Sequence, residues 1–440
     1  MSRRRWRWQG LFADLEPLRQ SPPFRVLYLA RSVSLLAISV LAVAVAWQVY
    51  ALSGSSLHVA GVTVALATGT LAGLLWGGTL ADQGDRRFIM IWGRAAYVGV
   101  VCLLWANSLR PEPGLVLIYL ATLLSGLTSG FSAPALMAAL PRMVPDHHLA
   151  SAGALNALAM ELGRLIGPLI AGMLLARSSP AMCYGLVLIG AALVPLLLAR
   201  LPRDLLLPDP QTAPQHTARR PMFRQWGEGV RYVTHDPVIA CLLGLDLVAM
   251  LFVSVHTVMP QLGDAVLSGG PQMVGYLYAA PAVGALLVAV SSGWTRTLAR
   301  PGRVVILCTV LWGLAVMLAG FAAAGVRDGG NAWAPWLVLA CLAVSGMTDT
   351  ATDIVRGALL QLHTPDPLRG RVSALWLLQG SVGPALGGLQ VAGFATLWSP
   401  SRAMVAGGAL CAGVVSLAVG MPGSPLRRSL WRLGSRADAK

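Results

Sequence analysis

Ionisable side chains lie inside stretches of this chain that are otherwise apolar. Asp349 and Asp353 are four residues apart, and Arg356 follows one helical turn later. On a helix this spacing places all three side chains on one face. Two carboxylates one turn apart repel each other in a low-dielectric interior, which favours the binding of a proton there. The group is therefore a candidate proton carrier, and salt bridging to Arg356 or Arg300 is the alternative interpretation.

Other charged residues occupy similar positions in different apolar stretches. Glu161 and Arg164 have the spacing of a helical ion pair, so their role is either functional or purely structural. Arg31 and Arg94 lie about two turns into their stretches, where each either faces the protein interior or extends to the membrane surface. A charged group is costly in lipid and by default indicates function. The candidate residues for proton coupling are Glu161, Asp246, Asp349 and Asp353.

The elements that hold these residues are predicted to be membrane-spanning helices. The chain has 440 residues, of which 56% are hydrophobic and only 12% are charged, whereas soluble domains carry about 25% charged residues. Apolar runs of about 20 residues predict transmembrane helices. Twelve such runs are present, at 26–50, 58–81, 88–107, 114–137, 150–174, 181–200, 238–260, 272–295, 303–324, 334–358, 369–394 and 401–421. The prediction is an all-α integral membrane protein.

The distribution of positive charge predicts how these helices cross the membrane. Most of the 33 Lys and Arg residues fall in segments that would all lie on one side. The predicted outer loops hold only Arg110, Arg177, Arg327 and Arg402. Because cytoplasmic loops are enriched in Lys and Arg, we expect both termini in the cytoplasm. This arrangement also explains the net charge of +15 without nucleic-acid binding, since the basic ends would face anionic lipid.

A long polar segment divides the chain into two groups of six helices. We expect a basic cytoplasmic segment at 1–25, an N-terminal half at 26–200, a cytoplasmic linker at 201–237, a C-terminal half at 238–421 and a basic tail at 422–440. The second part of the linker, 223–232, is predicted to form an amphipathic helix on the inner surface.

The two groups are related by weak internal repetition. The motif G-P-x-x-(A/G)-G occurs at Gly167–Gly172 in the fifth run and again at Gly383–Gly388 in the eleventh, 216 positions later. The loop at Gly293–Arg300 similarly repeats the loop that begins at Gly78, 215 positions later, with Thr297 in place of an aspartate. Two similar offsets indicate two structural repeats, as many transporters have.

The ten residues Gly78–Arg87 form a short charged loop between two apolar runs. Their pattern, G-x-L-A-D-x-x-x-R-R, resembles the loop between helices 2 and 3 of major facilitator superfamily transporters. The resemblance implies a fold of 12 transmembrane helices in two six-helix halves. It also implies a conformational latch made by Gly78, Asp82, Arg86 and Arg87, which favours the outward-facing state. The alternative is a solvated turn that only sets the topology.

The repeated motif in the fifth run, with Gly163, Gly167, Pro168 and Gly172, resembles the antiporter signature of the same superfamily. That resemblance implies export driven by inward proton movement, with glycines that let the halves pack closely and slide. Plain helix packing needs the same residues and is the alternative interpretation. The arginine that antiporters of the superfamily carry in the middle of helix 4 is missing, because 120–136 contains no charge.

Further stretches are similar to bacterial siderophore exporters of the enterobactin type. They are Pro22–Ser34, Val43–Gln48, Gly77–Asp82, Pro111–Leu115, Gly275–Ala280, Gln361–Asp366 and Gly370–Val372. The similarity implies a monomeric, proton-driven exporter in the cell inner membrane that moves a siderophore to the periplasm and hands it to an outer-membrane efflux channel. The substrate cavity would be lined by Arg31, Trp47, Gln48, Arg164 and Tyr278. Asp349 and Asp353 depart from this pattern, which leaves a hydroxamate or polyamine-based chelator as an alternative cargo.

Other classes of function find little support in the sequence. The seven histidines form no metal or triad motif, no Walker loop is present, and the six cysteines have the placement of packing residues. We therefore expect neither an enzyme nor a cofactor or metal site. A multidrug or macrolide efflux pump of the same superfamily is the main alternative. A membrane sensor would need a soluble output domain, and no segment exceeds the linker in length.

Overall fold

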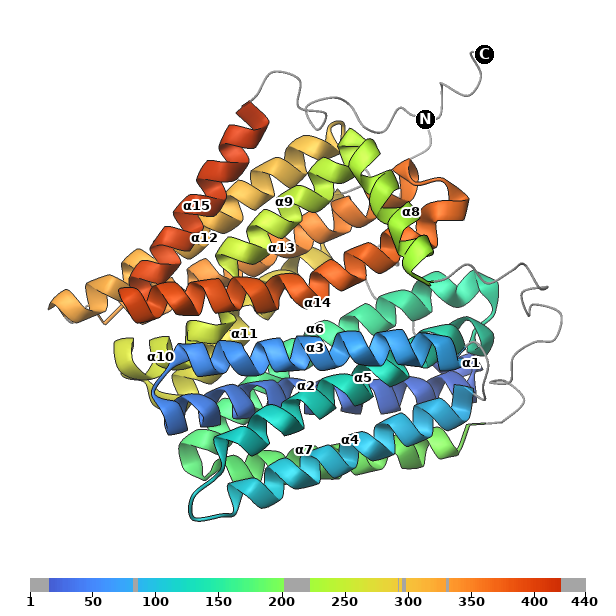
Figure 1. Cartoon of the computed structure of the whole chain (residues 1–440), viewed down its shortest axis with the longest axis horizontal. Helices are drawn as coiled ribbons and strands as arrows, with labels where there is room; N and C mark the ends of the chain where they lie inside the picture. Colours follow the sequence, from blue (N-terminus) through green and yellow to red (C-terminus); the bar gives the residue numbers. More distant parts are fainter. Residues whose placement is uncertain are drawn as a thin grey trace, which may run out of the picture.

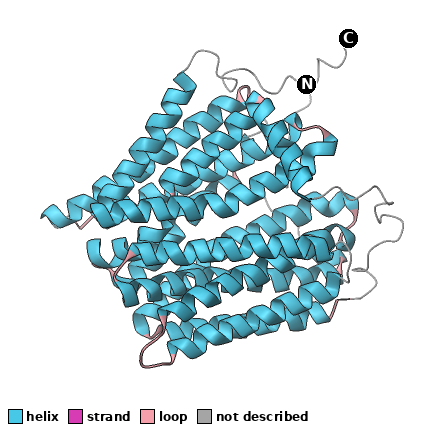
Figure 2. Cartoon of the chain, in the orientation of Figure 1, coloured by secondary structure: helices cyan, strands magenta, loops and turns pink. Residues whose placement is uncertain are grey.

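The computed structural model describes residues 16–81, 86–201, 222–291, 293–294, 298–329 and 332–420. Helices account for nearly all of these residues, and no strand occurs among them (Figure 2). Twelve of the helices are long and apolar enough to cross a membrane. This confirms the prediction of an all-α integral membrane protein with 12 transmembrane helices.

The first six spans follow a short helix, α1 (Glu16–Gln20). They are α2 (Pro22–Ser53), α3 (Ser56–Ala81), α4 (Arg86–Ser108), α5 (Leu115–Met143), α6 (Leu149–Arg177) and α7 (Pro180–Ala199). The 3-10 turn η2 (Asp146–His148) precedes α6. These elements form the N-half.

The last six spans form the C-half, and helix α8 (Met222–His235) precedes them. Its first span is interrupted: it consists of α9 (Pro237–Val253), the 3-10 turn η3 (Val255–Val258), α10 (Met259–Gln261) and the π-helical turn η4 (Leu262–Val266). The remaining spans are α11 (Gly270–Val290), α12 (Pro301–Gly329), α13 (Ala334–His363), α14 (Asp366–Leu397) and α15 (Pro400–Gly420).

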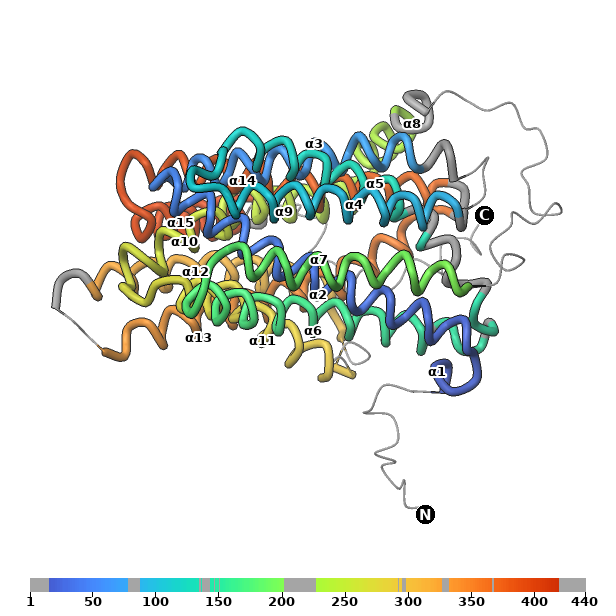
Figure 3. The backbone as a smooth tube through the Cα atoms, turned by 90° about the horizontal axis from the view of Figure 1, so that it is seen from below, coloured from blue at the N-terminus to red at the C-terminus, as the bar shows by residue number. Residues whose placement is uncertain are grey.

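The two halves lie side by side, with α3 next to α14 and α6 next to α11 (Figures 1 and 3). We call the end of the bundle that carries α1 and α8 the linker end, and the opposite end the far end. In Figure 1 the helices of the two halves meet at the far end, on the left, and diverge toward the linker end, on the right. The structure therefore shows one conformation of a two-part bundle.

The first helix of each half begins in the same way. Ser21 caps α2 by accepting a hydrogen bond from the Phe24 amide, and Pro22 follows it. Asp236 caps α9 by accepting from two amides, and Pro237 follows it. Such side chains satisfy amides that have no helical partner, and proline is pre-shaped for the first helical position. Pro22 and Pro237 are 215 positions apart, which agrees with the sequence repeat.

Glycines set the closest helix contacts in both halves. A Cβ on Gly126 of α5 would overlap the Leu66 carbonyl of α3. In the C-half, a Cβ on Gly346 of α13 would overlap the Pro281 carbonyl of α11. Small residues allow such backbone contacts in membranes, where hydrophobic burial does not drive helices together. The second and fourth spans of each half are thus packed in the same way.

The first span of the C-half is broken where its N-half counterpart is continuous. Helix α9 ends at Ser254, whose φ of −75° and ψ of 73° depart from helical geometry. The Ser254 hydroxyl donates to the Met250 carbonyl at 2.5 Å, which satisfies a group that the break would leave unpaired. Interrupted helices in membranes occur where the backbone is covered by protein. Here η3 is covered by α3 and α14.

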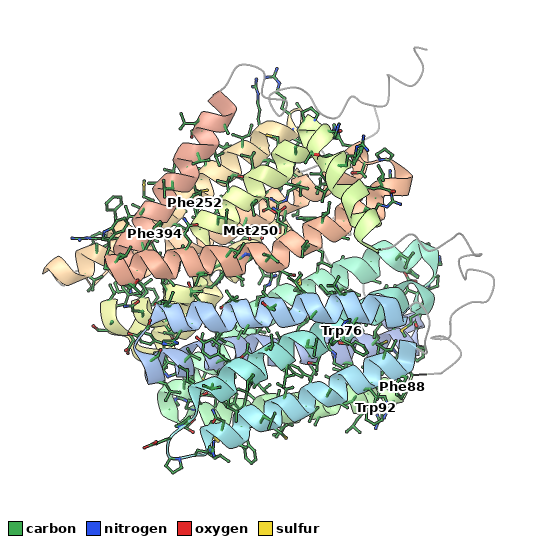
Figure 4. All side chains as sticks on the ribbon, viewed as in Figure 1. Trp76, Phe88, Trp92, Met250, Phe252 and Phe394 are labelled. Carbon is green, nitrogen blue, oxygen red and sulfur yellow. The ribbon has the colours of Figure 1, made fainter. Side chains whose placement is uncertain are left out.

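Aromatic side chains mark both ends of the bundle. Trp76, Phe88 and Trp92 lie near the linker end of the N-half and are all more than half exposed (Figure 4). Trp333 and Trp398 are similarly exposed at the far end. Tryptophan is enriched at both membrane–water interfaces because its ring is apolar with one polar group. These residues are placed to fix the depth of the bundle in the bilayer.

Helix α8 is attached to the linker end of the C-half. Glu228 forms an ion pair with Arg371 of α14 at 2.5 Å, and the Tyr232 hydroxyl donates to the His363 carbonyl at 3.0 Å. Burial and the nearby Asp236 carboxylate raise the pKa of Tyr232, which keeps its hydroxyl protonated as a donor. The helix that follows the linker therefore belongs to the C-half.

Candidate functional site

A buried ion network joins three helices of the C-half. Arg356 of α13 forms an ion pair with Asp246 of α9 at 2.6 Å, and the two side chains are 1% and 0% exposed. The same guanidinium pairs with Asp353 and lies 5.8 Å from the ring centre of Trp376 on α14. Gln379 of α14 donates to the other oxygen of Asp246 at 2.8 Å. The network therefore fixes α9, α13 and α14 relative to one another.

The charges of this region do not balance. Asp246 and Asp353 share the single guanidinium of Arg356, and Asp349 makes no hydrogen bond or ion pair with another described residue. A buried charge is tolerated only when it is paired or neutralised. Three carboxylates thus surround the guanidinium of Arg356, which gives this part of the C-half an excess of negative charge.

The sequence predicted only part of this network. The alternative interpretation of Asp353, a salt bridge to Arg356, describes its geometry, whereas Arg300 makes no ion pair with a described residue. The partnership of Asp246 with Arg356 was missed. Asp246 and Arg356 are 110 positions apart, so no local spacing could reveal it. Gln379 was missed as well, because a lone glutamine carries no signal of its own.

Glu161 and Arg164 of α6 form the expected ion pair, with 3.1 Å between Oε1 of Glu161 and Nη1 of Arg164. The two ends of the pair differ in their surroundings. The Glu161 side chain is 11% exposed, while that of Arg164 is 60% exposed. The guanidinium has five N–H donors, so this one bond leaves Arg164 free to bind a further group.

Arg164 lies on the side of α6 that faces the C-half. It is one and two helical turns from Pro168 and Gly172, both of which contact α11. Its charge acts on Asp349 of α13 and on His256 of η3. The exposed His256 ring stacks on Tyr278, 5.8 Å between centroids, and the Tyr278 hydroxyl donates to the His256 carbonyl at 2.6 Å. Arg164 and Tyr278, both predicted cavity residues, thus lie at the meeting of the two halves.

The two other intramembrane arginines lie close together in the N-half. Arg94 of α4 donates a hydrogen bond to the Ser34 hydroxyl of α2 at 2.8 Å, and the positive charge of Arg31 acts on Arg94. Nε of Arg31 is buried and has no hydrogen-bond partner among the described residues. These two guanidiniums give the N-half an excess of positive charge, and they repel each other.

Trp47 and Gln48, which the resemblance placed on the cavity wall, are positioned differently. Gln48 is 4% exposed and accepts a 2.5 Å hydrogen bond from the buried Tyr184 of α7. Trp47 is half-buried and lies beside Tyr50, with 6.3 Å between ring centroids. In this conformation Gln48 is therefore a core residue of the N-half, because a buried amide needs a polar partner and Tyr184 supplies one.

The glycines of the fifth span divide into two groups. A Cβ on Gly163 or Gly167 would meet α2 of the same half, at Leu35 and Ser39. A Cβ on Gly172 would lie 2.9 Å from the Gly275 Cα of α11, in the other half. The expectation that the whole motif packs between the halves is thus corrected: Gly172 lies at the contact, Pro168 reaches it through its carbonyl, and the first two glycines serve packing within the N-half.

Polar and apolar contacts close the far end. The Ser56 hydroxyl of α3 donates to Oε1 of Gln261 in α10 at 2.7 Å, which joins the two halves. Val274 and Tyr278 of α11 pack into the core of the N-half together with Tyr50 and Leu175. The contacts between the halves described so far lie from mid-bundle to the far end, in agreement with the divergence of the helices toward the linker end (Figure 1).

The predicted latch lies largely outside the described residues. Asp82 is among the residues that are not described, as is the neighbouring turn. Gly78 lies in the last turn of α3, and Arg86 and Arg87 begin α4. Helix α3 does run beside α14, which is the neighbour that the latch requires. Among the residues that the structure describes, no cluster of His, Cys, Asp or Glu could hold a metal ion.

Comparison with known proteins supplies the family. The chain is 31% identical over 406 residues to the enterobactin exporter EntS of Escherichia coli, which covers 91% of this chain and 92% of that protein. EntS of Escherichia fergusonii matches to the same extent. Among solved structures, a POT family transporter in complex with 5-aminolevulinic acid is similar, with 14% identity, 91% and 96% of the two chains covered and a TM-score of 0.71.

The nucleoside transporter NupG is similar in the same way, with 11% identity, 90% and 98% of the two chains covered and a TM-score of 0.68. These two likenesses show the fold alone. The model of the transmembrane secretion effector family matches residues 12–424. The chain is therefore a transporter of the major facilitator superfamily and belongs to its transmembrane secretion effector family.

Proposed function

We propose that this protein exports a siderophore from the cytoplasm to the periplasm, across the inner membrane, in exchange for protons. The observation that carries the proposal is the 31% identity to enterobactin exporters over 91% of the chain. Siderophores are made inside the cell and act outside it, so their export needs a carrier that works against a gradient. The two halves of the molecule would expose the cargo to each side in turn.

The direction of transport rests on charge and on the shape of the bundle. By the positive-inside rule, the linker end would lie in the cytoplasm. The halves contact each other through Ser56–Gln261 and Gly172–Gly275 at the far end. A bundle closed at the far end and divergent at the linker end would then accept cargo from the cytoplasm. Release would require these far-end contacts to open and the linker end to close.

Closure of the linker end is the step in which the predicted latch would act. Asp82 would lie near the start of α14, where the positive end of a helix favours a carboxylate. Arg86 and Arg87 would pair with carboxylates or lipid headgroups. Such contacts exist only when the linker end is closed, so they would favour the outward-facing state.

Proton coupling would come from the charge imbalance of the C-half. Asp246 and Asp353 pair with different nitrogens of Arg356, and Asp349 has no partner among the described residues. A proton that binds to one carboxylate removes a repulsion, and its release on the cytoplasmic side restores it. If protonation released one of these carboxylates from Arg356, proton binding would be linked to the relative positions of α9 and α13.

A transport assay in intact cells tests the proposed cargo. A strain that lacks the protein, grown without iron, should retain its own siderophore, and the extracellular amount should fall several-fold. Re-expression should restore export. An unchanged extracellular siderophore together with a new sensitivity to antibiotics would reject the proposal and identify a drug efflux pump.

Asp349→Asn tests the proton carrier in the purified protein reconstituted in vesicles. The variant should bind cargo but lose the accumulation that an imposed pH gradient drives. Glu112→Gln makes the same chemical change in an exposed loop and should transport normally. Asp353→Asn is the second variant, and full gradient-driven transport by both Asp variants would contradict this assignment.

A further inference from the structure

Arg164 and Asp349 are charged residues of opposite halves that lie at similar positions along their helices. Each lies near the middle of its helix, α6 and α13 respectively. Arg164 lies on the face of α6 that contacts α11, which in turn packs against α13, and the charge of Arg164 reaches Asp349. They do not form an ion pair with each other. The gap between a donor on one half and an acceptor on the other is where a transporter of this fold holds its cargo.

Both groups have binding capacity that the protein itself leaves unused in this conformation. Arg164 is 60% exposed and bonds only to Glu161 among the described residues. Asp349 has no hydrogen-bond or ion-pair partner among them, and the nearby guanidinium of Arg356 is already held by Asp246 and Asp353. An Arg side chain binds carboxylates and other oxygen acceptors, and a carboxylate binds ammonium groups or protons.

We propose that the cargo is amphoteric: it carries oxygen acceptors that bind Arg164 and a protonated amine that binds Asp349. This inference rests on the proposed function and specifies the chemical class of the siderophore. The same molecule would contact both halves at once. Its departure would leave Arg164 and Asp349 without their partners, which links cargo release to the rearrangement of the halves.

Cargoes of a single charge type fit this region less well. A purely anionic chelator would satisfy Arg164 but would lie against Asp349 and the half-exposed Asp353 carboxylate. A purely cationic one would meet Arg164 and the positive charge of the N-half. Like-charge contacts of this kind reject wrong partners at the expense of several kcal/mol. An amine-bearing hydroxamate chelator has both required groups and avoids both repulsions.

The test is a binding measurement on the full-length protein in detergent with a matched pair of ligands. Metal-free desferrioxamine B carries three hydroxamates and one primary ammonium group. Its N-acetyl derivative keeps the hydroxamates and loses the charge. We expect the wild-type protein to bind the amine form about tenfold more tightly, which corresponds to about 1.4 kcal/mol and is within the range of close charge pairs.

Two substitutions assign the preference to its residues. Asp349→Asn should bind both ligands with similar affinity, because the carboxylate that distinguishes them is gone. Arg164→Gln should weaken both ligands by about the same factor and keep the preference for the amine, since a charge-assisted hydrogen bond is worth more than one tenfold step. Arg164→Lys should retain part of the binding. The loop variants Glu112→Gln and Arg110→Gln control for the change of net charge and should behave as the wild type.

Equal binding of the two ligands by the wild-type protein would overturn the inference, and so would a preference that survives in Asp349→Asn. Failure of both ligands to bind would overturn it too. The outcome is separable from that of the proposed function. If enterobactin, a catechol chelator without an amine, binds while neither hydroxamate does, siderophore export stands and the amphoteric cargo is rejected.

Discussion

The two halves of this transporter share one design but hold opposite charge in their interiors. Arg31 of α2 and Asp246 of α9 are 215 positions apart, the same offset that separates Pro22 from Pro237 at the start of the two helices. Each is the same number of residues into its helix. One repeat thus places a guanidinium where the other places a carboxylate. The backbone repeats, while the electrostatics is reversed.

The fourth spans differ even more. Pro145-Asp146 after α5 and Pro365-Asp366 after α13 are 220 positions apart. By this offset the N-half counterparts of Asp349, Asp353 and Arg356 are Ser129, Ala133 and Leu136. The glycine contacts of α5 and α13 are nonetheless alike. Helix packing therefore depends on features that both halves keep, and the carboxylates of α13 are an addition to one half.

The difference shows how a duplicated fold can divide its work. The N-half keeps a neutral hydrogen bond, Tyr184–Gln48, in its core. The C-half keeps an ion network in which Arg356 pairs with two carboxylates. Neutral bonds hold a structure in place, whereas ion pairs with an excess of carboxylates respond to protons. We therefore expect energy coupling to depend on the C-half, and the following substitutions test this contrast between the two halves.

Removal of Arg356 should have the largest effect. Arg356→Ala leaves the fully buried Asp246 carboxylate without its partner, which typically destabilises a protein by about 3–5 kcal/mol. We expect little folded protein in membranes and a large fall in the detergent melting temperature. Arg31→Ala, at the repeat-related position of Asp246, should have a much smaller effect.

The control for this prediction is the double variant Asp246→Asn with Arg356→Gln. It removes both charges, so part of the lost stability should return. If Arg356→Ala is as stable as the wild type, the network does not hold the C-half together and the comparison between the halves loses its basis.

The second effect concerns the seam between the halves rather than the interior of one. A Cβ at position 172 would lie within about 3 Å of the Gly275 Cα and of the Pro271 carbonyl oxygen. Gly172→Leu would add a whole side chain at this position. Overpacking of this kind costs about 1–3 kcal/mol, and separation of the far end relieves it. The variant should shift the population several-fold toward the state that is open at the far end.

An impermeant maleimide added on the side of the far end measures this shift, with Val274→Cys as the reporter in a background without other cysteines, because Val274 of α11 is buried against the N-half. Gly163→Ala is the matched control, because its new methyl meets α2 within the N-half. It should change stability and leave the labelling rate unchanged. Equal labelling of both variants would mean that the seam does not govern opening.

Loss of the Ser56–Gln261 hydrogen bond should have the smallest effect. Ser56→Ala removes a hydroxyl donor from a bond between the halves, and such bonds contribute about 0.5–1.5 kcal/mol. The labelling assay should report a two- to tenfold higher opening of the far end, with no change in the melting temperature of either half. A variant that labels like the wild type would show that apolar contacts alone close the far end.

The sequence predicted the fold well and the site unevenly. Long apolar runs and arginine placement are local properties, so the twelve spans could be identified one by one. The Glu161–Arg164 pair was also local and is present. The hydrogen bond of Gln48 to Tyr184 was missed because the sequence does not show which face of α2 meets α7. The Asp246–Arg356 pair was not predicted for the same reason, since it joins two helices that are far apart in the chain.

By itself the sequence determined the class of the molecule: its helices, its repeat, its family and the presence of costly charges inside the membrane. These follow from composition and from spacings of a few residues, which act before any tertiary contact forms. Only the tertiary structure decided which charges meet. Arg356 could have paired with any of several carboxylates, and helix packing brought it to Asp246 and Asp353 and left Asp349 without a partner among the described residues. Packing decides this because buried charges interact strongly only over a few ångströms, a distance that no linear pattern specifies.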